Sequence, residues 1–125
     1  MTDNQLNEVV RLPLSMLAHG RSGDKGDSVN IGLIAHETDW LPVLESVITP
    51  EWLANLFGEE VKGDIEVYSV PGVGAVNCVL NGALQGGGTV SLRKDAQGKL
   101  FGQVILQAEV DLPIQQAIRL GLIQP

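Results

Sequence analysis

The chain has 125 residues, which is the size of one ordinary domain with room for an aliphatic core. Its formal net charge of −7 repels phosphate backbones and anionic lipid, so we expect neither nucleic acid nor a membrane as a partner. No apolar run approaches the roughly 20 residues of a spanning helix, the N-terminus is too polar for a targeting peptide, and the single cysteine fits a reducing compartment, which together predict a cytoplasmic protein.

The first elements are predicted from alternating apolar residues. Residues 12–19 and 29–36 both alternate, which predicts two strands. In the second strand Val29, Ile31, Leu33 and Ala35 are expected to face the core. Residues 20–28, between the two strands, are predicted to be a loop.

The middle of the chain predicts two helices and a strand. Apolar residues recur at three- and four-residue steps from Trp40 to Ile48, which is typical of a helix. Thr49 and Pro50 form a predicted helix start, and Gly58 ends that second helix. A strand is predicted over residues 65–70.

The last third predicts a helix, a hairpin and a final short helix. The helix covers residues 73–85, with Asn77 in a polar stripe that is either solvated or part of a site. The hairpin pairs residues 89–94 with 99–110, and the last helix covers 113–121. We therefore expect one domain over residues 1–125, with a core from about 12 to 112. Its predicted class is an α+β sandwich, a mostly antiparallel sheet with helices on one face.

The stretch from Gly20 to Asn30 is the most unusual in the sequence and is predicted to be the functional site. Its glycines recur every third residue, so the backbone can curve and point N–H groups at an anion. Arg21 can bind a carboxylate or phosphate through two parallel hydrogen bonds. The alternative is that the loop charges pair only with each other. The predicted ligand-binding residues are Arg21, Ser22, Gly23, Asp24, Lys25, Gly26, Asp27, Asn30 and Asn77.

Candidate catalytic groups are Asp24 and Asp27, as acid or base, and His19, as a base beside the loop. If the two strands pair as a hairpin, His36 is expected roughly 20 Å from His19, so the two histidines are not expected to share a metal. No known phosphate loop matches and no metal site is predicted, although Asp24 and Asp27 could hold a hard cation such as Mg²⁺, and the cofactor is left open. Cys78 is interpreted as a small apolar core residue.

Two motifs resemble a known family. They are AHGRSGDKGD at 18–27 followed by NIG at 30–32, and VNCVLNGAL at 76–84 followed by GGGT at 86–89 and SLR at 91–93. Together they are similar to the small C-terminal domain of the AtuA-like acyclic terpene utilisation proteins. The resemblance implies a ferredoxin-like α+β fold and a link to bacterial catabolism of terpenoid or branched acyl compounds.

Three functions follow as hypotheses. In that family the segment usually follows a much larger domain, so the chain is first interpreted as an accessory or binding subunit. It would use the loop to hold an anionic ligand or a separate AtuA-like large subunit. The second hypothesis is an enzyme component of lyase or hydratase type. The third is a structural homo-oligomer, and a homo-oligomer is compatible with all three.

Overall fold

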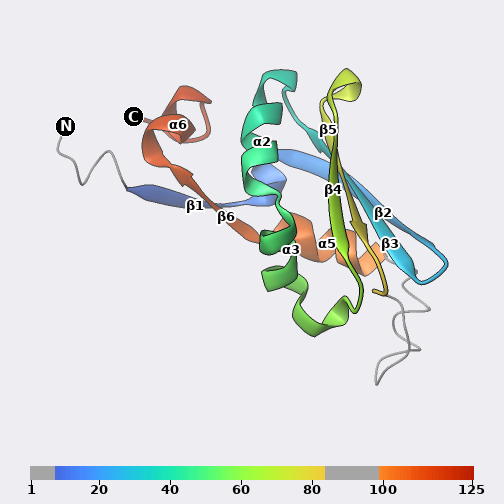
Figure 1. The fold of residues 1–125 in the computed structure, drawn as a ribbon. Coiled ribbons are helices and arrows are strands. Elements are labelled where there is room, and N and C mark those ends of the chain that lie inside the picture. The colour runs from blue at the N-terminus through green and yellow to red at the C-terminus, as the bar shows by residue number, and fades with distance from the viewer. Residues whose placement is uncertain (1–7, 84–98) are drawn as a thin grey trace.

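A computed structural model describes residues 8–83 and 99–125, and for Asp24, Lys25, Lys99 and Leu100 it describes the backbone alone. Within these residues the strands form a four-stranded and a two-stranded sheet, with helices beside them (Figure 1). The strands are β1 (Val9–Pro13), β2 (Ala18–Lys25), β3 (Ser28–Ala35), β4 (Ile65–Val70), β5 (Ala75–Leu80) and β6 (Glu109–Pro113). The helices are α2 (Leu41–Val47), α3 (Pro50–Phe57), α5 (Lys99–Gln107) and α6 (Ile114–Arg119).

The larger sheet is antiparallel throughout and has the strand order β2-β3-β5-β4. The predicted strand over 29–36 is confirmed as β3, shifted by one residue. Its apolar side chains, from Val29 to Ala35, are buried at every second position. β3 and β5 are the central strands, so β2 and β4 are the two edges.

A hairpin replaces the loop that was predicted over residues 20–28. β2 continues to Lys25, which pairs with Ser28, so only Gly26 and Asp27 connect β2 to β3. The pairing with β3 satisfies those backbone groups of this glycine-rich stretch that point toward β3. The single strand predicted over 12–19 is also wrong, because a 3-10 turn at Leu14–Met16 separates β1 from β2.

β5 occupies part of the helix that was predicted over residues 73–85. Its side chains alternate between buried and half-buried from Val76 to Leu80, which is the period of a strand. β4 has the predicted bounds and joins β5 through a 3-10 turn at Pro71–Val73. Residues from 84 onward in the predicted helix lie outside the described residues.

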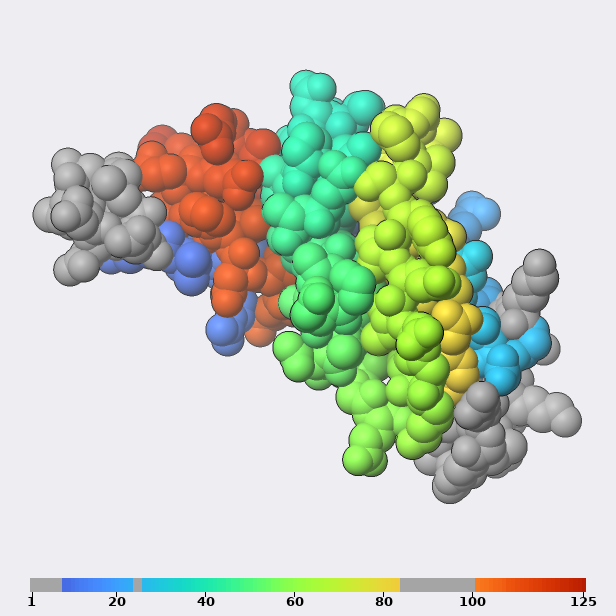
Figure 2. All heavy atoms as spheres, in the orientation of Figure 1, coloured from blue at the N-terminus to red at the C-terminus, as the bar shows by residue number. Residues whose placement is uncertain are grey.

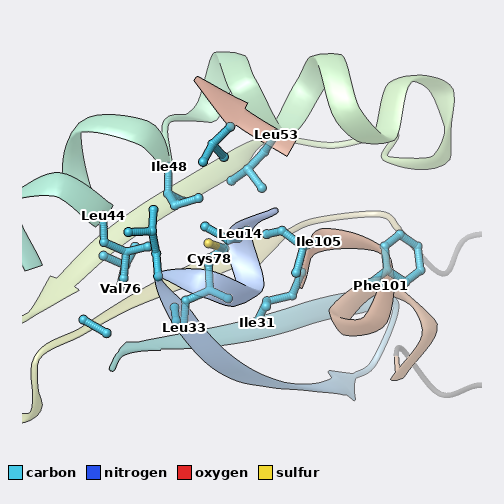
Figure 3. Close-up of a cluster of buried hydrophobic side chains, with 14 of the residues drawn as sticks. Leu14, Ile31, Leu33, Leu44, Ile48, Leu53, Val76, Cys78, Phe101 and Ile105 are labelled. Atoms are coloured by element: carbon cyan, nitrogen blue, oxygen red, sulfur yellow. The ribbon is translucent and has the colours of Figure 1, made fainter. Parts of the chain in front are cut away.

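α2 and α3 confirm the two predicted helices. The hydroxyl of Thr49 accepts a hydrogen bond from the backbone N–H of Trp52 at 3.1 Å, and Gly58 ends α3 with a φ of 56°. Both helices pack on one face of the larger sheet, and an aliphatic core fills the space between them (Figure 3). Fully buried members of this core include Leu14, Ile31, Leu33, Leu44, Leu53, Val76, Cys78 and Ile105.

α5 corrects the hairpin predicted at 89–94 and 99–110. Residues 99–107 form a helix, β6 follows it, and residues 89–94 lie outside the described residues. The ring of Phe101 packs on Phe57 of α3, with centroids 5.1 Å apart. On β2, the Ser22 hydroxyl accepts a hydrogen bond from the Gly102 N–H at 3.0 Å. α5 therefore covers the same face of the sheet as α3.

β1 and β6 form a separate two-stranded ribbon that carries α6 at one side of the molecule (Figure 1). The Arg11 Nε donates to a carboxylate oxygen of Asp111 across this ribbon at 3.0 Å. The predicted final helix is confirmed as α6, and Gly121, with a φ of 79°, follows it. Figure 2 shows α2 and α3 as a ridge between this C-terminal segment and β4.

The predicted class, an antiparallel α+β fold with helices on one face, is confirmed. Along the chain, the larger sheet and its helices follow the order β2-β3, then α2-α3, then β4-β5, then α5. If β2 were moved from the start to the end, this order would become βαββαβ, which is the ferredoxin-like order. The rearrangement explains why two strands precede the first helix.

Candidate functional site

The larger sheet has one face that no described helix covers. We call it the open face, and it consists of the side chains that alternate with the buried ones in the four strands. Neighbours across paired strands lie on the same face, so the register defines its members. They include His19, Arg21 and Gly23 of β2, Asn30, Gly32 and Ile34 of β3, Ala75, Asn77 and Val79 of β5, and Glu66, Tyr68 and Val70 of β4.

One row of the open face runs across all four strands. Arg21 pairs with Gly32, Gly32 with Asn77, and Asn77 with Tyr68. With about 4.8 Å between strands, the backbones of Arg21 and Asn77 lie about 10 Å apart. A Cβ placed on Gly32, between them, would meet no atom within 4 Å. The row therefore leaves an open floor between a guanidinium and an amide.

The next row places a negative charge at the β4 edge of the open face. It pairs Gly23 with Asn30, Asn30 with Val79, and Val79 with Glu66. The negative charge of Glu66 raises the pKa of the Tyr68 phenol two residues along β4. The β4 edge of the open face is therefore acidic, whereas the β2 edge carries Arg21.

Four predicted ligand-binding residues come together on the open face: Gly23 and three with polar side chains, Arg21, Asn30 and Asn77. Arg21 and Asn30 are exposed, and Asn77 is half-buried. Within the described residues, none of the three side chains has a hydrogen-bond or ion-pair partner. Asn77 reaches the face through β5 rather than through the predicted helix. Their polar groups are therefore available to bind something from outside the chain.

Ser22 lies on the helix-covered side of β2, where it bonds Gly102. Beside this contact is a hollow of about 350 Å³ at the β2 edge, lined by Gly20, Arg21, Ser22, Gly102, Gln103 and Leu106. Arg21 borders both this hollow and the open face, because β2 is an edge strand. Ser22 is thus part of the joint between β2 and α5.

The turn residues do not form the predicted anion nest. Of the three glycines, only Gly26 has a positive φ, 63°, while Gly20 and Gly23 are in extended strand. Asp27 follows Gly26 in the exposed turn. Asp24 pairs with Val29 and Lys25 with Ser28, and the side chains of these two residues are outside the described set.

The predicted separation of the two histidines is wrong. The rings of His19 and His36 are stacked, with centroids 5.5 Å apart and planes at 25°. His19 pairs with Ile34, so it lies at the base of the hairpin and not beside its turn. The error arose because residues 20–25 were interpreted as loop, whereas they extend the strand and carry the turn away from His19.

Two of the candidate catalytic groups, His19 and Asp27, lie far apart. His19 lies six strand residues before Lys25, so the turn with Asp27 is about 20 Å away at about 3.4 Å per residue. The described residues contain no group of three or more His, Cys, Asp or Glu side chains that could hold a metal ion. His19 and Asp27 of the same chain therefore cannot act together on one bond of a substrate.

Sequence reasoning missed Glu66 and Tyr68 as members of the face. They are two residues apart in a correctly predicted strand, and side chains two residues apart in a strand lie on the same face. This spacing could have identified them. The interpretation of Cys78 as a core residue is confirmed. It is fully buried, and burial raises the pKa of its thiol to about 12.

Of the helices in the described parts of the chain, none has the length and apolarity needed to cross a bilayer. No curated protein matches this sequence. No solved structure matches it either. The sequence model of one family, described as the AtuA ferredoxin-like domain, matches residues 12–111. Since that match covers most of the 125 residues, the chain belongs to the AtuA ferredoxin-like domain family.

Proposed function

We propose that this chain is a binding module in bacterial breakdown of terpenoid or branched acyl compounds, and that its open face holds an anionic group. The group is a carboxylate, carried either by an acyl compound or by a separate AtuA-like large subunit. The family membership supports the setting. The row Arg21–Gly32–Asn77 supports the binding chemistry.

The observation that carries the proposal is the exposed Arg21 guanidinium, which has no partner among the described residues. Guanidinium groups bind carboxylates through two parallel hydrogen bonds. Asn30 and Asn77 add amide donors on the same side of the sheet, and Gly32 leaves the floor between them free. A flat carboxylate lying over Gly32 would meet a cation on one side and an amide on the other.

The test is a titration of the protein with 3-methylbutanoate, a short branched carboxylate, followed by amide NMR. We expect shifts centred on Gly32 and Asn77, and no binding of the uncharged 3-methylbutanamide. Arg21→Ala should weaken binding at least tenfold because it removes the charge-assisted pair. Arg119→Ala is the matched control, since Arg119 is an exposed arginine on α6. Equal affinity for the acid and the amide would reject the proposal.

A second candidate, a homodimer, is favoured by the position of opposite charges on the open face. Arg21 lies on the β2 edge and Glu66 on the β4 edge. If two open faces stack about a twofold axis parallel to the strands, β2 of one copy lies over β4 of the other. Arg21 would then lie over Tyr68 of the partner subunit, about 7 Å along the strand from Glu66 of the partner subunit and within the length of an arginine side chain. Removing Glu66 separates the candidates, because it weakens this dimer but does not weaken carboxylate binding.

A further inference from the structure

His19 and His36 form an accessible imidazole pair at one end of the open face. Both side chains are exposed, and their ring centroids are 5.5 Å apart. Their backbones are fixed: His19 pairs with Ile34, and the N–H of His36 donates to the Leu17 carbonyl at 2.9 Å. The sheet therefore holds two nitrogen ligands side by side.

The hydrogen bond of His36 determines which of its nitrogens is available. Its Nε2 lies 2.8 Å from the backbone carbonyl oxygen of Ser15. A carbonyl oxygen only accepts, so Nε2 carries the proton and the neutral ring keeps its lone pair on Nδ1. Histidines that bind metals in proteins commonly donate their other N–H to a backbone carbonyl in this way.

The spacing of the rings matches two imidazoles on one ion. With metal–nitrogen distances of about 2.0–2.1 Å and tetrahedral angles, the centroids of two bound imidazoles lie roughly 5 Å apart. Here the ring planes are only 25° apart, so the His19 ring must turn about its side-chain bonds to point at an ion on Nδ1 of His36, whose ring the Ser15 hydrogen bond holds. Exposed side chains make such turns within nanoseconds.

The sequence leaves no competing set of nitrogen or sulfur ligands. The whole chain has two histidines and one cysteine. Cys78 is fully buried, and burial raises its thiol pKa to about 12, so it offers no thiolate to solvent. His19 and His36 are therefore the imidazole ligands that the chain can offer to an ion that prefers nitrogen or thiolate donors.

We propose that His19 and His36 together bind one divalent first-row transition-metal ion, such as Zn²⁺ or Ni²⁺. His19 precedes Arg21 by two residues on the same side of β2, so the ion would lie about 7 Å along the strand from Arg21. The site does not depend on the proposed carboxylate binding. If both exist, the ion adds positive charge to the same part of the open face.

The experiment is calorimetric titration of untagged protein with ZnCl₂ and NiCl₂ at pH 7.5. We expect one ion per chain, no binding of Mg²⁺, and at least tenfold weaker binding for His19→Ala and for His36→Ala. Asn30→Ala and Cys78→Ser should bind as the wild type does, because one lies elsewhere on the face and the other is buried. Zn²⁺ should also shift the ring signals of both histidines in NMR spectra.

Three results would overturn the proposal: no saturable binding to the wild type, wild-type affinity in either histidine variant, or Zn²⁺ shifts confined to one ring. Circular dichroism of each variant shows whether it is folded. The outcome is separable from that of the carboxylate test, because Arg21→Ala should leave the Zn²⁺ affinity within about threefold of the wild type.

Discussion

At the scale of single residues, burial makes the thiol of Cys78 unreactive, and the side chain serves to fill the core. It lies on the buried side of β5, paired with Ile31 and Val67. Desolvation disfavours its thiolate, which raises the pKa from the ordinary 9.0 to about 12. The unfolded chain loses this proton above about pH 9, while the folded chain keeps it.

This difference predicts a specific pH dependence of stability. The contribution of the thiol is fully present below pH 9 and is lost as the pH rises toward 12. Urea unfolding at pH 8 should find Cys78→Ala less stable than the wild type. At pH 10.5 the gap should shrink by up to about 2 kcal/mol, because only the wild type loses free energy through this proton. If the difference in free energy of unfolding between the wild type and Cys78→Ala is the same at pH 10.5 as at pH 8, the prediction is wrong. As a control, this difference should be the same at pH 7 and pH 8.

Single residues of the site were predictable when their chemistry alone decided their role. Arg21, Asn30 and Asn77 are polar groups that need solvent or a ligand wherever the backbone places them, and they do share the open face. Ser22 was assigned to the same site because it belongs to the stretch that was predicted to be one loop. In a strand, adjacent residues point to opposite sides, so Ser22 contacts α5 instead.

At the scale of elements, the secondary structure was predicted wrongly where the apolar residues fit both the period of a strand and the period of a helix. Residues 76–80 contain apolar side chains at both two-residue and three- to four-residue steps, so periodicity did not separate strand from helix. Pairing with both β3 and β4 made this segment a central strand. Residues 20–25 have the glycine content of a loop, but they form a strand because β3 supplies their backbone partners.

α5 depends on a contact that no local pattern contains. A Cβ on Gly102 would lie 2.6 Å from the Ser22 hydroxyl oxygen and 3.1 Å from the Ser22 Cβ. Glycine therefore lets the helix backbone approach β2, although glycine weakens helices by roughly 1 kcal/mol relative to alanine. Residues 99–107 contain β-branched side chains and were predicted as part of a strand. The contact with Ser22 that favours the helix joins residues far apart in the sequence, so no local pattern predicts it.

Gly102→Ala should consequently destabilise the fold. The gain in helix propensity is about 1 kcal/mol, whereas forcing a methyl group into a packed contact costs typically 1–3 kcal/mol. We expect a net loss of about 1 kcal/mol in the free energy of unfolding, measured with urea. Gln103→Ala, at the next and exposed position of α5, should change stability by less than about 0.5 kcal/mol. A Gly102→Ala protein more stable than the wild type would show that α5 is not held by this approach.

At the scale of the whole molecule, the open face raises the question of what covers it. Besides Arg21 and Glu66 it carries Tyr68 and Val70, which are 51% and 41% exposed, so apolar surface accompanies the charges. Stacking two such faces would bury these groups and pair the charges at both edges. A dimer of this kind needs no helix contact, which leaves α2, α3 and α5 unchanged.

Light scattering during gel filtration tests the dimer. We expect the wild type to have twice the mass of one chain at about 50 µM, and Arg21→Glu and Glu66→Arg each to be monomeric, because either change brings like charges near each other across the interface. The double variant should be dimeric again. Arg119→Glu is the control and should leave the mass unchanged. A monomeric wild type, or single variants that remain dimeric, would exclude this arrangement.

The ribbon of β1 and β6 has a mechanical consequence. Val9 at the start of β1 pairs with Pro113 at the end of β6, so both strands leave the ribbon at the same end. A force that pulls Val9 and α6 apart therefore acts across the strands and loads one pair of hydrogen bonds at a time. The ribbon should peel open like a zipper at low load, while the four-stranded sheet behind it bears none of the tension until the last pair, Pro13 with Glu109, has separated.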